Sequence, residues 1–444
     1  MRTSRRGAVA GVRARIHDVR YGFLFLPGAV AALVAASAPL LLAIDRTGGG
    51  EGVGIGFHAE PDAARTVLAT IAGSLITVAG LTFSITIVSL QLVSQQFSPR
   101  ALRGFLGDRL NQVVVGTFIG TFVYCVLVLR TVTEASDERE TFVPALSISV
   151  AVVLAVASIA LLLVFIHHMA RTIQVSSIAA GIAEATLSSL DPLYADSFGV
   201  GSEEDPDDVV RAWDEQHARY VVHPRRAGYV QSVALEDLPS LASTPDVRAR
   251  VVHAPGDFVT QATRLVEYWA DERDESFEQA ILRAVSVQNE RDMHQDVAFG
   301  LRQLADIALK AISPGVNDPT TAVTCIGYIR EILEHLAVRP IPRPVRRYGD
   351  GAATLVARAR PWEDYLETAL VELGRYAAPD ARVAVALLAA AAAAARAAAR
   401  AGMRDRLDAL RAVAGEIAER ANAAASAADR AAIASALADV ESVR

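Results

Sequence analysis

The chain has 444 residues, of which 52% are apolar and 21% are charged. It is too apolar for an ordinary soluble protein of this length and too charged for a membrane bundle alone, so we expect a hybrid of the two. The formal net charge is −7, and no block is basic enough to indicate a nucleic-acid partner. The two cysteines exclude a disulfide framework and argue against a cysteine-based metal site. No cofactor and no metal are expected.

Four apolar runs in residues 1–171 are long enough to cross a bilayer. The first follows an arginine-rich start but is longer than the apolar region of a signal peptide, so we expect it to be retained. The runs lie at residues 21–44, 66–93, 113–129 and 143–166. Arginine in place of lysine and abundant alanine are typical of a high-GC bacterial genome. We therefore expect a four-span domain in the bacterial inner membrane, with the lipid bilayer as its main partner.

Arginine placement predicts the orientation of the four spans, because short cytoplasmic loops carry an excess of basic residues. The start of the chain is arginine-rich, and the loop after the second run contains Arg100, Arg103 and Arg109. The loops after the first and third runs, residues 45–62 and 131–141, are acidic. Both termini are therefore expected in the cytoplasm.

The second apolar run is unusual because polar side chains recur along one face at three- and four-residue steps. These pore-lining candidates are Thr70, Ser74, Thr77, Ser84, Gln91 and Gln95. The seam could line a water-filled path, since unsatisfied polar groups are costly in hydrocarbon. Alternatively, the hydroxyl groups bond the carbonyl groups of their own helix, and the small residues pack against other helices. Polar residues on another face, Thr82, Thr86 and Ser89, favour this alternative.

Gly116 and Gly120 in the third run have the spacing that lets two helix backbones approach closely. The same spacing suits a contact between two copies or a contact inside one bundle. We interpret both glycines as helix-packing positions.

Residues 172–275 are expected to hold a cytoplasmic linker helix and a small β-domain. Valine and aromatic residues alternate after Arg225 and after Val247, which predicts strands. The second segment loosely resembles a lipoyl-type barrel-sandwich, but it has no lysine to carry such a cofactor. The acidic run at residues 201–208 is interpreted as a solvated linker. The fold class is thus a four-helix membrane domain plus a cytoplasmic α+β domain with a small β-barrel or sandwich and a helical C-terminal part.

Residues 276–340 follow a helical pattern that includes the segment SPGVNDPTTA, which begins at Ser313. In this segment Gly315 suits a left-handed position, and Asp318 predicts a helix N-cap with Asn317 as the alternative. The functional alternative is an anion site, because free amides at a helix start bind anions. The anion-binding candidates are Arg291, His294, Arg302, Asn317, Thr320 and Thr321.

Residues 341–444 begin with a proline-rich linker and a short strand-like segment, residues 352–359. The rest is expected to be helical, alanine-rich and packed through its alanines. The sequence contains no Walker loop, nucleophile elbow, zinc-binding helix motif or dinucleotide fingerprint, so we do not expect an enzyme.

Three long segments resemble one protein family. They are ITVAGLTFSITIVSLQLVSQQFSPRALRGFL from Ile76, QVVVGTFIGTFVYCVLVLR from Gln112 and FGLRQLADIALKAISPGVNDPTTAVTC from Phe299. In this order they resemble the bacterial predicted membrane proteins of domain-of-unknown-function family 2254, up to about Leu336. The resemblance implies a membrane protein and supplies neither an activity nor site residues.

Two classes of function are open from the sequence. The first is a homo-oligomeric channel or pore with a cytoplasmic gating domain, whose further partner is a small ion or an anionic ligand. The second is a membrane-anchored sensor or scaffold that conducts nothing, and a membrane-bound enzyme comes third. The spans hold no carboxylate or histidine at depth, which argues against proton-coupled transport. We place the channel first because of the polar seam.

Overall fold

The computed structural model describes residues 25–47, 60–96, 108–133, 141–172, 174–193, 200–234, 247–348, 353–377 and 380–444. The chain divides into two compact units, Met1–Ser177 and Ile178–Arg444. Each unit has its own cluster of buried apolar side chains.

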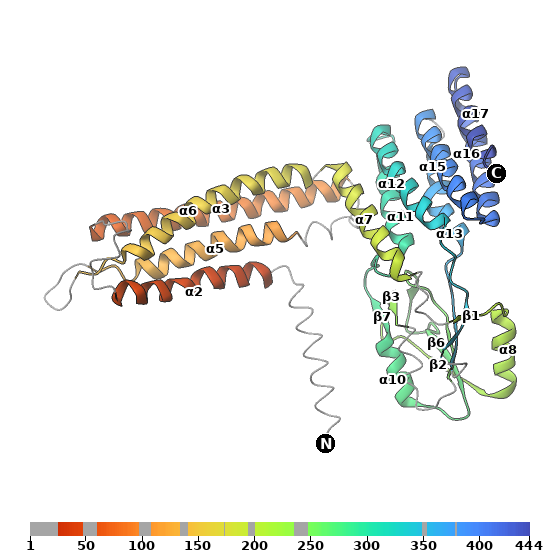
Figure 1. Cartoon of the computed structure of the whole chain (residues 1–444), viewed down its shortest axis with the longest axis horizontal. Helices are drawn as coiled ribbons and strands as arrows, with labels where there is room; N and C mark the ends of the chain where they lie inside the picture. Colours follow the sequence, from red (N-terminus) through yellow and green to blue (C-terminus); the bar gives the residue numbers. More distant parts are fainter. Residues whose placement is uncertain are drawn as a thin grey trace. The chain divides into compact units, whose positions relative to one another are not determined.

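Among the described residues of the first unit, four long apolar helices run side by side (Figure 1). They are α2 (Phe25–Thr47), α3 (Pro61–Gln96), α5 (Arg109–Leu129) and α6 (Ala145–Thr172). The shortest has 21 residues and is about 31 Å long at 1.5 Å per residue, which matches the roughly 30 Å hydrocarbon core of a bilayer. Among the described residues, five helices are long and apolar enough to cross a membrane, and the fifth is α15 (Ala381–Arg400) of the second unit.

Helix α5 contacts the other three helices of the first unit, and two glycines allow its close approach to α2. A Cβ atom at Gly116 would lie 2.7 Å from the carbonyl oxygen of Pro27, and one at Gly120 would lie 2.9 Å from the Cα atom of Ala31. Both neighbours are backbone atoms that cannot rotate away. The two glycines are therefore required where α5 crosses α2.

Two aspartates cap helices of the first unit, and each also links two helices near one end of α6. Asp45 of α2 accepts hydrogen bonds from the N–H groups of Leu146 and Ser147 at the start of α6, both at 3.0 Å. Asp108 caps α5 through the N–H group of Leu110 at 2.8 Å and also bonds the ring of His168 near the end of α6. Each carboxylate satisfies amides that have no partner within their own helix.

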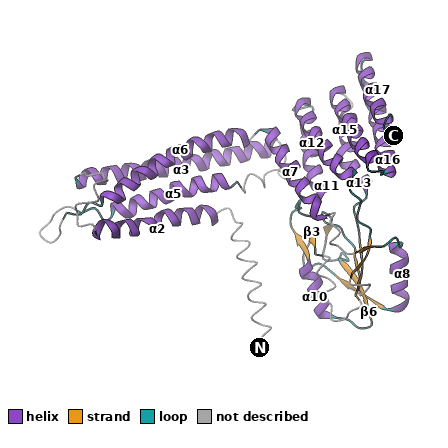
Figure 2. Cartoon of the chain, in the orientation of Figure 1, coloured by secondary structure: helices purple, strands orange, loops and turns teal. Residues whose placement is uncertain are grey.

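The second unit combines a helical layer with strands (Figure 2), and the described strands form two β-sheets. Besides α15, its long helices are α7 (Val175–Leu193), α11 (Val297–Ala311), α12 (Pro319–Ala337), α16 (Arg404–Ala424) and α17 (Ala427–Glu441). A π-helical turn, η4 (Glu367–Val371), separates α13 (Trp362–Leu366) from α14 (Glu372–Ala377). Helix α15 packs against α12, α16 and α17, and most of its alanines are buried.

The larger sheet has six strands in the order β1-β8-β9-β4-β6-β2. Their bounds are β1 (Val200–Gly201), β8 (Val345–Tyr348), β9 (Ala353–Ala357), β4 (Val247–Val251), β6 (Val266–Ala270) and β2 (Ala218–Val222). All neighbouring strands are antiparallel except β4 and β9, which are parallel with Val251 opposite Ala357. The smaller sheet has the strand order β5 (Phe258–Val259), β3 (Gly228–Val233) and β7 (Val285–Gln288). Helix α8 (Pro206–Gln216) packs on the larger sheet through Trp213 and Trp269, and α10 is Glu275–Ala284.

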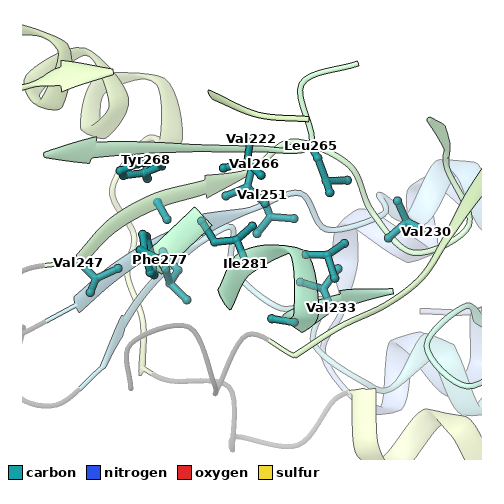
Figure 3. Close-up of a cluster of buried hydrophobic side chains, with 14 of the residues drawn as sticks. Val222, Val230, Val233, Val247, Val251, Leu265, Val266, Tyr268, Phe277 and Ile281 are labelled. Carbon is teal, nitrogen blue, oxygen red and sulfur yellow. The ribbon is translucent and has the colours of Figure 1, made fainter. Parts of the chain in front are cut away.

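One apolar cluster joins both sheets to α10 (Figure 3). It includes Val222, Val247, Val251, Val266 and Tyr268 of the larger sheet, Val230 and Val233 of β3, and Phe277 and Ile281 of α10. Tyr268 packs edge-on against Phe277, with ring centroids 5.4 Å apart. Removal of these large side chains from water holds the two sheets together.

Three details differ from the expectations drawn from the sequence. The β region is a pair of sheets with one parallel strand pair, and neither a barrel nor a sandwich is confirmed. The acidic run is not wholly a linker, because Asp205 caps α8 and the next residues form its first turn. The left-handed residue before α12 is Asn317, with φ 49°, rather than Gly315, since asparagine also tolerates that conformation.

Candidate functional site

The polar seam of α3 faces away from the core of the first unit. Its described members are all exposed, namely Thr70, Ser74, Thr77, Ser84 and Gln91. On the opposite side of the helix, Leu68, Ala72 and Ala79 are buried, and α3 packs there against α5 and α6. The side chain of Gln95 lies outside the described residues. The seam therefore does not line a path inside a single copy of the chain.

Most of the seam hydroxyl groups bond their own helix. Thr70, Thr77 and Ser84 each donate to the carbonyl oxygen four residues earlier, over 2.7, 2.9 and 3.0 Å. These bonds reduce the cost of placing a hydroxyl group in apolar surroundings. The amide of Gln91 makes no hydrogen bond with another described residue and still needs polar partners.

Gly73 and Gly80 border the seam and leave open space beside it. A Cβ atom at either position would have no atom within 4 Å. Small residues with room around them let another helix backbone approach closely. The outward face of α3 thus combines polar groups with space for a second helix.

A second set of polar side chains lies inside the first unit. Thr82, Thr86 and Ser89 of α3 are buried, as are Asn111 of α5 and Ser158 of α6. The amide of Asn111 and the hydroxyl group of Ser158 have no hydrogen-bond partner among the residues described. Buried polar atoms of this kind commonly bond ordered water. The sequence pattern did not single out Asn111 or Ser158.

The arginines predicted to bind an anion are each paired with a carboxylate. Arg291 donates two hydrogen bonds to Oδ2 of Asp296, at 2.9 and 2.6 Å. Arg302 forms an ion pair with Glu372 at 2.5 Å. His294 is exposed, and its backbone N–H group donates a hydrogen bond to Oδ1 of Asp292.

The predicted N-cap of α12 is confirmed. Asp318 accepts a hydrogen bond from the N–H group of Thr321 at 3.1 Å and one from its hydroxyl group at 2.6 Å. The Thr321 hydroxyl and N–H groups hold the pKa of Asp318 below its ordinary value. Asn317 and Thr320 are exposed beside this cap, and α11, about 22 Å long, separates them from Arg291. The structure therefore does not bring the six predicted anion-binding residues together.

A cavity of about 120 Å³ lies where β4 and β9 end. Because these strands are parallel neighbours, the segments that follow them leave the sheet at the same edge. The start of α11, Arg346 of β8 and Tyr365 of α13 close the other sides. The carboxyl ends of parallel strands are where open α/β sheets bind ligands.

Apolar and cationic side chains share the wall of this cavity. Its basic residues are Arg346, Arg358, Arg360 and His253. Burial lowers the pKa of Arg346, while Arg360 lies 3.8 Å from Asp257. Arg358 is exposed and makes no ion pair or hydrogen bond with another described residue. The sequence interpretation missed this site, and its one local signal is the Arg-Ala-Arg triplet that follows the β9 pattern.

The turn after β4 forms one side of the cavity and requires glycine. Gly256 has φ 95°, and its N–H group donates to the carbonyl oxygen of Val230 at 2.8 Å. A Cβ atom at Gly256 would collide with the carboxylate of Asp296 and lie 3.0 Å from Arg291. The Arg291–Asp296 pair is thus packed directly beneath this turn.

The described residues thus include several apolar helices of membrane-spanning length, which is typical of a membrane protein, and a separate mixed α/β unit. The chain belongs to the family described as "Predicted membrane protein (DUF2254)", whose model matches residues 20–393. The family resemblance is confirmed, and the match continues beyond Leu336 into α15.

Two mycobacterial proteins are similar to this chain. An uncharacterized protein of Mycobacterium tuberculosis and one of Mycobacterium bovis are each 35% identical over 338 residues. The similarity covers 75% of this chain and 64% of each relative, so the chain spans less than two thirds of their length. No solved structure matches the chain.

Proposed function

We propose that the protein is a multi-pass protein of the bacterial inner membrane whose copies assemble into a pore for a small ion. Helices α2, α3, α5 and α6 cross the bilayer, with both termini in the cytoplasm. The outward polar face of α3 lines the shared axis. The second unit regulates the pore from the cytoplasmic side.

Four spans are proposed rather than five because α15 differs from the other apolar helices. Of the 18-residue apolar stretch of α15, 67% is buried within the chain, whereas 17–50% of the corresponding stretch is buried in each of the other four helices. Its apolar character comes mainly from alanine, which suits close packing against α12, α16 and α17. Its exposed residues include Arg382, Arg396 and Arg400, which do not suit lipid.

The observation that carries the proposal is an exposed polar face in a unit whose other exposed side chains are largely apolar. Leu33 of α2 and Val153 and Leu163 of α6 are 65–74% exposed, which suits contact with lipid. Ser74, Thr77 and Ser84 of α3, with Gly73 and Gly80 beside them, offer lipid little apolar surface. Water along an axis shared with other copies would solvate these hydroxyl groups.

Cysteine labelling in intact membranes tests this proposal, using the full chain with both native cysteines replaced. Thr77→Cys, Ser84→Cys and Gln91→Cys should react with a water-soluble thiol reagent, because the reactive thiolate needs water. Phe83→Cys is the matched control. Phe83 is 53% exposed but faces away from the seam, so its cysteine should stay unreactive in lipid.

Two further results would contradict the shared axis. Reaction at Ser158→Cys without reaction at Ser84→Cys would place the aqueous path inside a single bundle. Absence of labelling at every seam position, together with no conductance of the purified protein in bilayers, would remove the pore. Where conductance is found, Ser84→Leu should reduce it, since an apolar side chain at a narrow point favours dewetting.

The second candidate function is a membrane-anchored sensor or scaffold that conducts nothing. The hydrogen bonds of Thr70, Thr77 and Ser84 to their own helix favour it, because they allow these hydroxyl groups to face lipid or a packed helix. The cavity at the ends of β4 and β9 also favours it, since a ligand site alone suffices for a sensor. The labelling pattern separates the two functions.

A further inference from the structure

We propose that the cavity at the carboxyl ends of β4 and β9 binds a small organic anion. The ligand is a carboxylate or a phosphate monoester whose apolar body is about the size of a benzene ring. The cavity, at about 120 Å³, is comparable with an apolar cavity of about 150 Å³ known to admit benzene. The site lies wholly within the second unit, so the proposal does not depend on the pore.

Two guanidinium groups are placed to hold the charged end of this ligand. Arg346 of β8 and Arg358, just after β9, come from adjacent antiparallel strands and line the same cavity. Nε of Arg346 donates to the carbonyl oxygen of Arg343 at 3.2 Å, which orients its side chain. Arg358 has no partner among the described residues and is available to a ligand. Guanidinium groups bind carboxylate and phosphate through paired N–H donors.

The acidic side chains around the cavity do not cancel this positive charge. Asp296, 1% exposed, is held by Arg291 through two hydrogen bonds to one oxygen. Arg360 lies between Asp257 and Asp364, at 3.8 and 3.7 Å. The four arginines here, Arg291, Arg346, Arg358 and Arg360, therefore outnumber the three carboxylates, and the His253 ring lies 3.5 Å from Asp257. The surplus charge on the wall is positive.

The rest of the wall selects an apolar body over a bare inorganic anion. Val251, Val297 and Ile341 line the cavity and offer no hydrogen bonds. An inorganic anion that entered would lose water without replacement on that side. An apolar ring or branched chain would instead be removed from water by these residues, as in most small-molecule sites.

Isothermal titration calorimetry of the purified full chain in detergent tests the proposal with four probes. Phenyl phosphate or benzoate should bind at least about tenfold more tightly than inorganic phosphate, which lacks an apolar ring, and benzyl alcohol, which lacks an anionic group. Preference for phenyl phosphate or for benzoate identifies the ligand as a phosphate monoester or a carboxylate. Absence of binding by both, or equally tight binding of inorganic phosphate, would overturn the proposal.

Matched variants locate the binding in this cavity. Arg358→Gln should weaken it about tenfold without affecting folding, because the side chain is exposed. Arg347→Gln is the control on β8, because Arg347 does not line the cavity and pairs with Glu204 at 2.7 Å. Ala357→Leu should abolish binding by filling the cavity. Unchanged affinity in Arg358→Gln or Ala357→Leu, or an equal loss in Arg347→Gln, would contradict the assignment.

Discussion

Replacing Arg291 by methionine removes the partner of a carboxylate that is almost fully buried. Asp296, 1% exposed, accepts two hydrogen bonds from Arg291 and one from the N–H group of Phe299 at 3.2 Å. Methionine keeps a flexible apolar stem next to Phe299, over whose ring the guanidinium lies at 5.0 Å. The substitution therefore removes the charge with little loss of packing.

The expected cost follows from leaving a buried charge without its partner, which is about 3–5 kcal/mol. The Phe299 N–H group and Arg360 still stabilise the carboxylate, so we expect the lower end, about 3 kcal/mol. For a unit of this size that corresponds to a Tm lower by roughly 6–12 °C. Arg291→Lys keeps the positive charge and should cost only about 1 kcal/mol.

The cost should also depend on pH, because burial raises the pKa of Asp296 while Arg291 and Arg360 oppose the rise. Loss of Arg291 raises the pKa further. A carboxyl group whose pKa is higher in the folded than in the unfolded state destabilises the fold as the pH rises through the folded-state value, and has no such effect below the unfolded one. The difference in the free energy of unfolding between Arg291→Met and the native chain should therefore be smaller at about pH 5 than at about pH 8.

Tryptophan fluorescence gives the measurement without isolating the second unit. The three tryptophans of the chain, Trp213, Trp269 and Trp362, all lie in that unit. Thermal melts of the full chain in detergent therefore report its unfolding. Equal melts of Arg291→Met and the native chain near pH 8, or an equal gap at both pH values, would refute the role assigned to the pair.

Two smaller predictions concern the α12 cap and the orientation in the membrane. Asp318→Ala should destabilise the second unit by about 1 kcal/mol, and Asp318→Asn by clearly less. Equal melting temperatures of the native chain and both variants would contradict the capping role of Asp318. The pKa of Asp318 is lowered in the folded state, so its carboxylate stabilises the fold above the unfolded-state pKa, and this stabilisation is lost as the pH falls through the folded-state pKa. The difference in unfolding free energy between Asp318→Ala and the native chain should therefore be smaller in acid. A periplasm-active reporter should give a signal after Glu134 and none after Arg444, and the reverse pattern would refute the orientation.

The helices of the first unit were predictable because the signal for them is local. An apolar run of sufficient length identifies each helix, although α3 extends beyond the predicted 66–93 to Pro61–Gln96. Hydropathy marks only the apolar part of a helix, and its polar ends continue the same backbone hydrogen bonding. The direction in which a helix faces is less local. The seam at Thr77 and the buried Thr82 look alike in sequence, and only packing against α5 and α6 distinguishes them.

The cavity could not be predicted, because it depends on which strands become neighbours. Alternation of apolar residues assigns the two faces of a strand but does not name its partner. Residues 252–352 separate β4 from β9, and their parallel pairing needs a crossover that no short turn signals. An arginine at the end of a short strand-like segment is by default a solvated surface residue, so Arg358 gave no reason to expect a site. Once β4 and β9 are paired, Arg358 lines the same cavity as Arg346, the cavity that we propose to bind a small organic anion.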